Sequence, residues 1–285
     1  MASVPLRFEP SVTETVTTTT RLDGFGPIVG SSDAMQDLYG VLSAVAPTEF
    51  SVLVTGETGT GKELVARALH EASARKNGPF VVVDCGALPA TLAESILFGH
   101  EKGSFTGAVG RTSGAFLDAN GGTLFLDELG ELPEELQPKL LRAIAERSIK
   151  RVGGARYEDV DIRFVAATRR DLRKEMNARR FREDLFFRLA QVRVETPPLR
   201  ERLDDVPSIV TSVCRRLDRV DSIDHVIGHI LHRFRAYDWP GNVRELVTVA
   251  SVLSVLGTGA TESVLDAVLQ HRNPRLRTHQ PRQPG

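Results

Sequence analysis

The chain has 285 residues, of which 41% are hydrophobic and 26% charged, the composition of an ordinary soluble globular protein with room for one large or two modest domains. Its 36 basic residues nearly balance its 37 acidic ones, so the net charge gives no support for a nucleic-acid or membrane surface. The two cysteines, Cys85 and Cys214, are too few for a disulfide framework or a zinc site. The sequence has no apolar run near the roughly 18 residues of a membrane span, and its N-terminus has no signal-peptide pattern. The cytoplasm is therefore the expected location.

The N-terminal residues 1–22 carry few signals of regular structure. Their run TETVTTTT, at Thr13–Thr20, is typical of a flexible linker or tail, or of the remnant of an upstream domain. The sequence does not decide between a linker or tail and such a remnant.

Residues 23–198 alternate between short apolar runs and stretches with helical spacing. Strands are expected at 51–55, 80–83, 123–126 and 162–167, and helices at 62–74, about 92–97 and from Pro133 onward. Short buried strands separated by helices are typical of a parallel sheet with helices on both faces, so the sequence predicts an α/β fold.

Beyond the break at Pro197 and Pro198, only helical patterns occur. They predict a smaller all-helical domain over 199–270, with helices at 204–217, 226–234, 243–256 and 262–269. Residues 271–285 hold four arginines and no acidic residue, which favours a disordered basic tail.

A glycine-rich loop follows the first predicted strand and precedes a helix. It reads Gly56, Glu57, Thr58, Gly59, Thr60, Gly61, Lys62, Glu63. In this context the GxxxxGK pattern indicates a phosphate site, because glycines turn backbone N–H groups toward the ligand, the lysine supplies a charge and the helix N-terminus adds its dipole. The pattern usually ends in Ser or Thr, whose hydroxyl binds Mg²⁺; Glu63 stands here, so the metal must be held by another residue or by water.

Two acids end the apolar run at 123–126. Asp127 is expected to hold Mg²⁺ and Glu128 to polarise the attacking water, because α/β sheets place ligands at the carboxyl ends of their strands. Paired acids after a strand also occur in plain solvated loops, and the phosphate loop is what favours the catalytic interpretation.

Several further segments agree in order and spacing with one known family. They are GETGTGKE at 56–63, FGHEKGSFTGA at 98–108, GGTLFLDE at 121–128, RVGG at 151–154, FREDLFFRL at 181–189, PPLRER at 197–202 and WPGNVREL at 239–246. Over about residues 26–256 the chain therefore resembles the AAA+ central domain of bacterial sigma-54-dependent transcription activators. The resemblance implies an AAA+ α/β subdomain at 23–198 with a helical lid at 199–270, ATP hydrolysis with Mg²⁺, and a homo-oligomeric ring, hexamer or heptamer, that remodels the sigma-54 RNA polymerase holoenzyme.

The resemblance also implies roles for individual residues. The loop that would contact sigma-54 comprises Gly103, Ser104, Phe105, Thr106, Gly107 and Ala108, with Phe105 and Thr106 at its tip. Arg182 and Arg188 look like arginine fingers that reach the γ-phosphate of a neighbouring subunit. Thr168 matches a residue that reads the γ-phosphate within its own subunit, and Arg244 matches the lid arginine that senses nucleotide.

The chain departs from the family pattern at three residues and in two domains. Ser104 stands where alanine is usual, Arg169 stands where asparagine or histidine is common, and Asp84 replaces an asparagine that is thought to hold the catalytic glutamate back. We find no helix-turn-helix pattern after residue 256 and no N-terminal sensor domain, so either an isolated motor domain or a protein without its own DNA anchor is expected.

Two other functions remain possible on the residues alone. One is a nucleotide-bound regulatory subunit that does not turn over, which the intact Lys62, Asp127 and Glu128 argue against. The other is an AAA+ remodeller with a client other than sigma-54, which the GSFTGA loop argues against.

Overall fold

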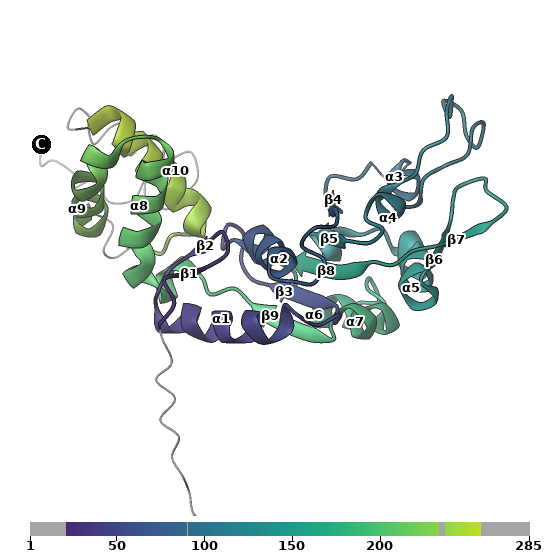
Figure 1. The fold of residues 1–285 in the computed structure, drawn as a ribbon, viewed down its shortest axis with the longest axis horizontal. Coiled ribbons are helices and arrows are strands. Elements are labelled where there is room, and N and C mark those ends of the chain that lie inside the picture. Colours follow the sequence, from purple (N-terminus) through teal and green to yellow (C-terminus); the bar gives the residue numbers. More distant parts are fainter. Residues whose placement is uncertain (1–20, 90, 234–236, 258–285) are drawn as a thin grey trace, which may run out of the picture.

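A computed structural model describes residues 21–89, 91–233 and 237–257 of the chain (Figure 1). The threonine-rich run at Thr13–Thr20, the helix expected at 262–269 and the basic tail at 271–285 lie outside these residues. Within them, no helix has the length and apolar character needed to cross a bilayer.

The α/β part is built on a five-stranded sheet with the order β4-β5-β8-β3-β9, in which every neighbouring pair is parallel. The strands are β3 (Val52–Thr55), β4 (Phe80–Asp84), β5 (Thr123–Asp127), β8 (Arg163–Thr168) and β9 (Val192–Glu195). The predicted α/β fold is confirmed. The edge strand β9 was not predicted, because only Val194 of its four residues is buried and no continuous apolar run marks it.

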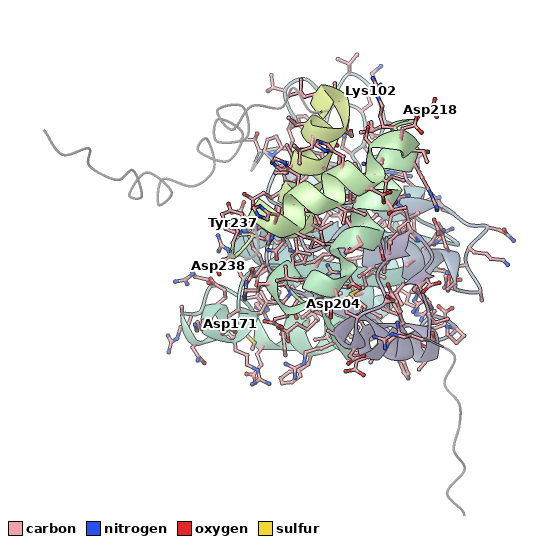
Figure 2. All side chains as sticks on the ribbon, turned by 90° about the vertical axis from the view of Figure 1, so that its left-hand side faces the viewer. Lys102, Asp171, Asp204, Asp218, Tyr237 and Asp238 are labelled. Carbon is pink, nitrogen blue, oxygen red and sulfur yellow. The ribbon has the colours of Figure 1, made fainter. Side chains whose placement is uncertain are left out.

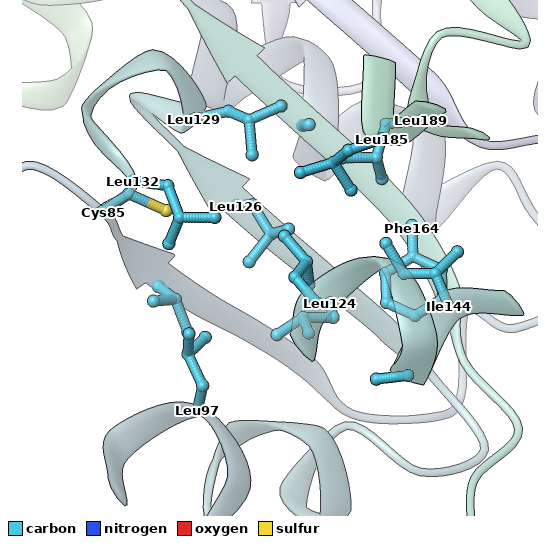
Figure 3. Close-up of a cluster of buried hydrophobic side chains, with 14 of the residues drawn as sticks. Cys85, Leu97, Leu124, Leu126, Leu129, Leu132, Ile144, Phe164, Leu185 and Leu189 are labelled. Carbon is cyan, nitrogen blue, oxygen red and sulfur yellow. The ribbon is translucent and has the colours of Figure 1, made fainter. Parts of the chain in front are cut away.

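Helices cover both faces of this sheet. They are α1 (Asp33–Val45), α2 (Lys62–Glu71), α3 (Ala93–Phe98), α4 (Ala115–Asp118), α5 (Gln137–Glu146), α6 (Leu172–Asn177) and α7 (Glu183–Leu189). Strand side chains alternate between faces. Leu124, Leu126 and Phe164 pack with residues of α3, α4, α5 and α7 (Figure 3), whereas Val54 and Phe125 pack with residues of α1 and α2. Each face therefore has its own core, and the carboxyl edge of the sheet is left to carry the site.

The helix predicted to open at Pro133 begins in two steps. A 3-10 turn, η2 (Glu134–Leu136), follows Pro133, and α5 then starts at Gln137 with Pro138 in its first turn. The first turn has no intrahelical acceptor for its N–H groups, so proline is tolerated there without loss of a hydrogen bond.

A loop and a hairpin project together from the end of the molecule that lies far from the lid (Figure 1). The loop joins α3 to α4, and the hairpin is formed by β6 (Ser148–Lys150) and β7 (Tyr157–Asp159). His100 makes isolated bridges to Thr112 and to Val152, and the Glu101 N–H donates to the Val152 carbonyl at 3.0 Å. The two projections are thus tied to one another at their bases.

Beyond β9 the described chain is helical and forms a lid. Its helices are η3 (Leu199–Glu201), η4 (Leu203–Asp205), α8 (Val206–Arg216), η5 (Val220–Ser222), α9 (Ile223–Arg233) and α10 (Asn242–Leu256). They enclose a separate apolar core that includes the buried Trp239. Figure 2 looks onto this lid, with Asp204 before the start of α8 and Asp218 just past its end. The predicted helical lid is confirmed for the described residues.

Candidate nucleotide-binding site

The phosphate loop lies between β3 and α2, as the sequence predicts. Gly56, Gly59 and Gly61 all have positive φ angles, of 150°, 82° and 103°. At Gly59 a side chain is also excluded by space, because a Cβ would collide with the Gly241 carbonyl oxygen of the lid. This glycine therefore lets the lid approach the loop directly.

Lys62 is buried at the first turn of α2. Its ammonium donates to the carbonyl oxygens of Gly56 at 3.0 Å and Glu57 at 3.1 Å. Burial lowers the pKa of Lys62, and the nearby carboxylates of Glu128 and Asp127 partly oppose this shift. The side chain is thus a poorly solvated cation, which favours the binding of an anionic oxygen beside it.

A cavity of about 360 Å³ brings the predicted phosphate and metal residues together. Its walls come from the phosphate loop, the end of β5 and the start of α10; they are Thr58, Gly59, Gly61, Lys62, Glu63, Leu64, Asp127, Glu128, Val243, Arg244, Val247 and Thr248. The lid arginine therefore shares one cavity with the loop lysine and the two acids, although it is 182 residues from Lys62 in the chain.

The two acids occupy different environments. Burial raises the pKa of Asp127 above its usual value, although its Oδ1 accepts a hydrogen bond from the Glu128 N–H at 2.9 Å, and the Glu128 charge adds to the rise. Glu128 has a left-handed backbone with φ of 47°, an uncommon conformation for a residue with a side chain. Such a conformation at the end of a strand turns the glutamate away from the direction that the strand would give it.

A second cavity, of about 260 Å³, adjoins the first and was missed by the sequence analysis. It lies between the short hairpin of β1 (Gly24–Phe25) and β2 (Ile28–Val29), helix α2 and the lid. Its lining is mainly apolar and includes Ile28, Val29, Ile209 and Val213, and it shares Leu64 and Val243 with the phosphate cavity. A largely apolar pocket next to a phosphate site suits the base of a nucleotide. No contiguous motif marks these residues, because they come from three distant segments.

A polar clamp between lid and loop, centred on the buried Asn242, was also not predicted from the sequence. Asn242 donates through Nδ2 to the Thr58 carbonyl at 3.0 Å and to Glu57 Oε2 at 3.1 Å, while its Oδ1 accepts from the Leu199 N–H at 2.8 Å. Arg200 binds Glu57 through two hydrogen bonds of 2.8 and 2.9 Å, and these hold the pKa of Glu57 below its usual value. The loop is therefore tied to the start of the lid at several points.

Thr168 and Asp84 make contacts that differ from those implied for them. Thr168 is fully buried at the end of β8, where its Oγ1 accepts from the Arg170 N–H at 3.0 Å, and it lines a separate hollow rather than the phosphate cavity. Asp84 Oδ1 accepts from the N–H groups of Gly86 and Ala87, at 2.9 and 3.3 Å. Glu128 instead accepts a hydrogen bond from the Arg169 N–H at 3.3 Å.

Of the two finger candidates, Arg182 lies just before α7 and Arg188 lies on it, and neither lines a wall of the phosphate cavity of its own chain. Arg182 precedes the helix and pairs with Asp184 through hydrogen bonds of 3.0 and 2.7 Å. Arg188 is exposed near the end of the helix, and within the described residues no ion pair holds its side chain. Both guanidinium groups are thus presented to solvent.

In the loop at 103–108, neither glycine is packed against other residues at its Cβ position. Gly103 and Gly107 have φ angles of 79° and 102°, with free space where a Cβ would stand. Thr106 is exposed, and Phe105 is 37% exposed with its ring edge-on to His100 at 5.0 Å. At the ends of the tip, Ser104 packs against Gly153 of the β6–β7 hairpin, and Ala108 is buried.

A parallel sheet with a phosphate loop after β3, two acids at the end of β5 and a helical lid over the loop defines an AAA+ ATPase domain. Residues 28–195 match the family described as the Sigma-54 interaction domain, and residues 200–282 match the AAA+ ATPase lid domain. The chain therefore belongs to the sigma-54 interaction domain family.

Similar proteins of known identity agree with this assignment. The DNA-binding transcriptional activator HyfR of Escherichia coli K12 is 48% identical over 255 residues, which cover 89% of this chain and 38% of HyfR. The DNA-binding transcriptional regulator NtrC of Azospirillum brasilense is 50% identical over 234 residues, which cover 81% of this chain and 48% of NtrC. The crystal structure of NtrX from Brucella abortus in complex with ATP is 36% identical, with a TM-score of 0.71 over 84% of this chain and 55% of NtrX. The chain spans about half or less of the length of these curated relatives.

Proposed function

We propose that this chain is the motor domain of a sigma-54-dependent transcription activator, which hydrolyses ATP and remodels the sigma-54 RNA polymerase holoenzyme through the loop Gly103–Ala108. The observation that carries the proposal is the single cavity that gathers Lys62, Asp127, Glu128 and Arg244 from the loop, the sheet and the lid. The relatives support the same activity, since one of them is described as a transcriptional activator and another was crystallised with ATP.

The nucleotide is expected to lie across both cavities. Its phosphates bind the N–H groups of the loop, the Lys62 ammonium and the start of α2, and its base enters the apolar pocket beside Ile28 and Val213. Arg244 reaches the phosphates from the lid. Because the ligand then touches the sheet domain and the lid together, its binding and release are coupled to the position of the lid.

Mg²⁺, when bound, neutralises charge on the phosphates. Asp127 fits it as a ligand, since its half-buried carboxyl faces the phosphate cavity beside Glu128 and burial raises its pKa. Among the described residues no group of three or more acidic, histidine or cysteine side chains forms a metal cage. Phosphate oxygens and waters therefore complete the shell, a ligand set that Mg²⁺ favours. Glu63 pairs with Arg67 at 3.3 Å on the surface of α2.

Hydrolysis needs a base at one side of the γ-phosphate and positive charge around it. Glu128 accepts a proton from the attacking water as the new bond to phosphorus forms and the bond to the ADP oxygen breaks. Arg182 and Arg188 of a neighbouring copy supply the charge, which their exposure away from their own cavity supports. A finger in trans requires a homo-oligomeric ring, a hexamer or a heptamer, in which each site lies between two copies.

The contact with sigma-54 is assigned to Phe105 and Thr106. The exposed ring offers apolar area and the hydroxyl offers a polar handle, which are properties of interface residues. The open glycines on either side allow the tip to rise and fall as the nucleotide changes.

Binding to purified sigma-54 with ADP and aluminium fluoride, a mimic of the phosphate in transfer, tests the proposal. The unaltered chain is expected to form a trapped complex, and Phe105→Ala is expected to lose it while retaining ATP hydrolysis. Phe50→Ala is a matched control, because Phe50 is 51% exposed between α1 and β3 and should leave the complex intact. Hydrolysis without any trapped complex would rule out sigma-54 as the client and leave an AAA+ remodeller of another protein.

A further inference from the structure

The catalytic candidate Glu128 is held by a residue that the family pattern does not assign to it. Its Oε2 accepts a hydrogen bond from the Arg169 N–H at 3.3 Å and lies 3.8 Å from the Arg169 Nε. The two contacts come from the backbone and the side chain of the same residue, and both fall on one carboxylate oxygen. Glu128 is therefore drawn toward the segment between β8 and α6.

The Arg169 guanidinium is shared between two carboxylates. Its second terminal nitrogen lies 3.3 Å from Glu131 Oε1, and Glu131 is also bound by Arg170. The Arg169 side chain is 54% exposed, whereas that of Glu128 is only 23% exposed. The arginine is thus free to move into solvent or toward another anion, but the glutamate sits inside the site.

Arg169 also acts on the phosphate cavity. Burial is the main reason for the lowered pKa of Lys62, and the positive charges of Arg244 and Arg169 lower it further. A γ-phosphate beside Lys62 would consequently attract the Arg169 guanidinium as well, because it carries more negative charge than the Glu128 carboxylate.

We propose that Arg169 is a positioning residue that holds Glu128 in a resting orientation and releases it when a γ-phosphate competes for the guanidinium. While Arg169 is paired with Oε2, that oxygen is turned toward the segment between β8 and α6 and does not orient the attacking water. ADP lacks the competing phosphate and leaves the pair intact. The inference rests on the catalytic role proposed for Glu128.

Kinetics of four variants test this role, at a protein concentration where the rate per subunit is constant. Arg169→Ala is expected to raise basal kcat about two- to five-fold with little change in KM, where five-fold corresponds to the ~1 kcal/mol upper range of an exposed ion pair. Arg169→Lys restores a cation and should return kcat toward the unaltered value. Arg170→Ala is the matched control, since it loses the pairs with Glu131 and Glu175 but has no contact with Glu128.

Glu128→Gln separates the failure of this inference from the failure of the proposed site. If Glu128→Gln keeps its turnover, the catalytic assignment itself is wrong and the inference falls with it. If Glu128→Gln is inactive and Arg169→Ala has an unchanged or lowered kcat, only the inference is overturned.

Amide hydrogen exchange at single-residue resolution provides a readout that does not depend on turnover. The Arg169 N–H should exchange faster with a non-hydrolysable ATP analogue than with ADP, because Glu128 leaves it. The Arg170 N–H, bonded to Thr168 Oγ1, should exchange equally with both. Equal exchange of the Arg169 N–H with the two nucleotides would contradict the release.

Discussion

Asn242, the first residue of α10, donates a hydrogen bond from Nδ2 to the Thr58 carbonyl at 3.0 Å, and so fastens the lid to the phosphate loop. The residue is fully buried and has a positive φ of 51°. Its amide bonds both the phosphate loop and Leu199 at the start of the lid, which places one side chain at the point where the lid would sense nucleotide.

Removal of this clamp should weaken nucleotide binding. Asn242→Gly keeps the positive φ without strain but loses the donated hydrogen bonds to Thr58 and Glu57, which are worth about 1–2 kcal/mol together, or about 5- to 30-fold in affinity for ADP. Calorimetric titration measures the change. Ser251→Ala on the same helix, whose hydroxyl bonds only the Val247 carbonyl, should bind ADP normally. Equal affinities for the two variants would show that the clamp does not act on the nucleotide.

The finger arginines should be supplied in trans. Arg188→Ala is expected to reduce ATP hydrolysis by about 10³-fold, the usual effect of a missing arginine finger. Lys62→Ala should also be inactive, because it cannot hold the phosphates. Mixing the two should restore activity, since Lys62→Ala subunits offer Arg188 to sites that still hold ATP. A mixture as inactive as its components would argue against a shared site.

Asp127 should make the nucleotide-free protein less stable at neutral pH. Its folded pKa is raised, so its ionised form carries a cost that is full above the folded pKa and disappears as pH falls through that value toward the usual 3.8. Asp127→Asn is therefore expected to raise Tm at pH 7, with the gain shrinking toward pH 4. Thermal unfolding across this pH range measures it. A gain in Tm that grows as the pH falls would contradict a raised pKa for Asp127 in the folded protein.

Bound Mg²⁺ should reverse the order of the two Tm values, so that the unaltered protein becomes more stable than Asp127→Asn. Addition of Mg²⁺ with an ATP analogue is expected to stabilise the unaltered protein more than Asp127→Asn, because only the carboxylate supplies a charged ligand. Equal stabilisation of both proteins would show that Asp127 does not hold the metal.

The packing of Ser104 on Gly153 should couple the contact loop to the β6–β7 hairpin. A Cβ at Gly153 would stand 2.7 Å from the Ser104 Cβ, and φ there is 73°. Gly153→Ala is expected to cost about 1–2 kcal/mol of stability and to reduce the trapped sigma-54 complex several-fold, while ATP hydrolysis stays within two-fold. Gly110→Ala in the same loop has open space around it and should leave both unchanged. An unaffected sigma-54 complex in Gly153→Ala would remove the hairpin from the contact.

Short contiguous patterns were sufficient to predict the fold class and the phosphate loop. The loop is a local device in which glycines, lysine and the helix N-terminus are neighbours in the chain, so its residues can be read without knowing what packs on them. The same holds for Asp127 and Glu128, which simply follow an apolar strand. Their meeting with Lys62 also follows from the parallel sheet, whose strands end at one edge.

Only the tertiary structure decided which residues enclose the carboxyl edge of the sheet and which contacts restrain the groups at that edge. The apolar pocket is made by Ile28, Leu64 and Val213 from distant segments, and Asn242 reaches Thr58 across 184 residues, so no local pattern marks either feature. The hydrogen bond of Glu128 to Arg169 rather than to Asp84 depends on backbone turns that place N–H groups within reach of a carboxylate. Sequence determines which groups stand at the ends of the strands, whereas contacts between those ends depend on how sheet, loops and lid pack in three dimensions.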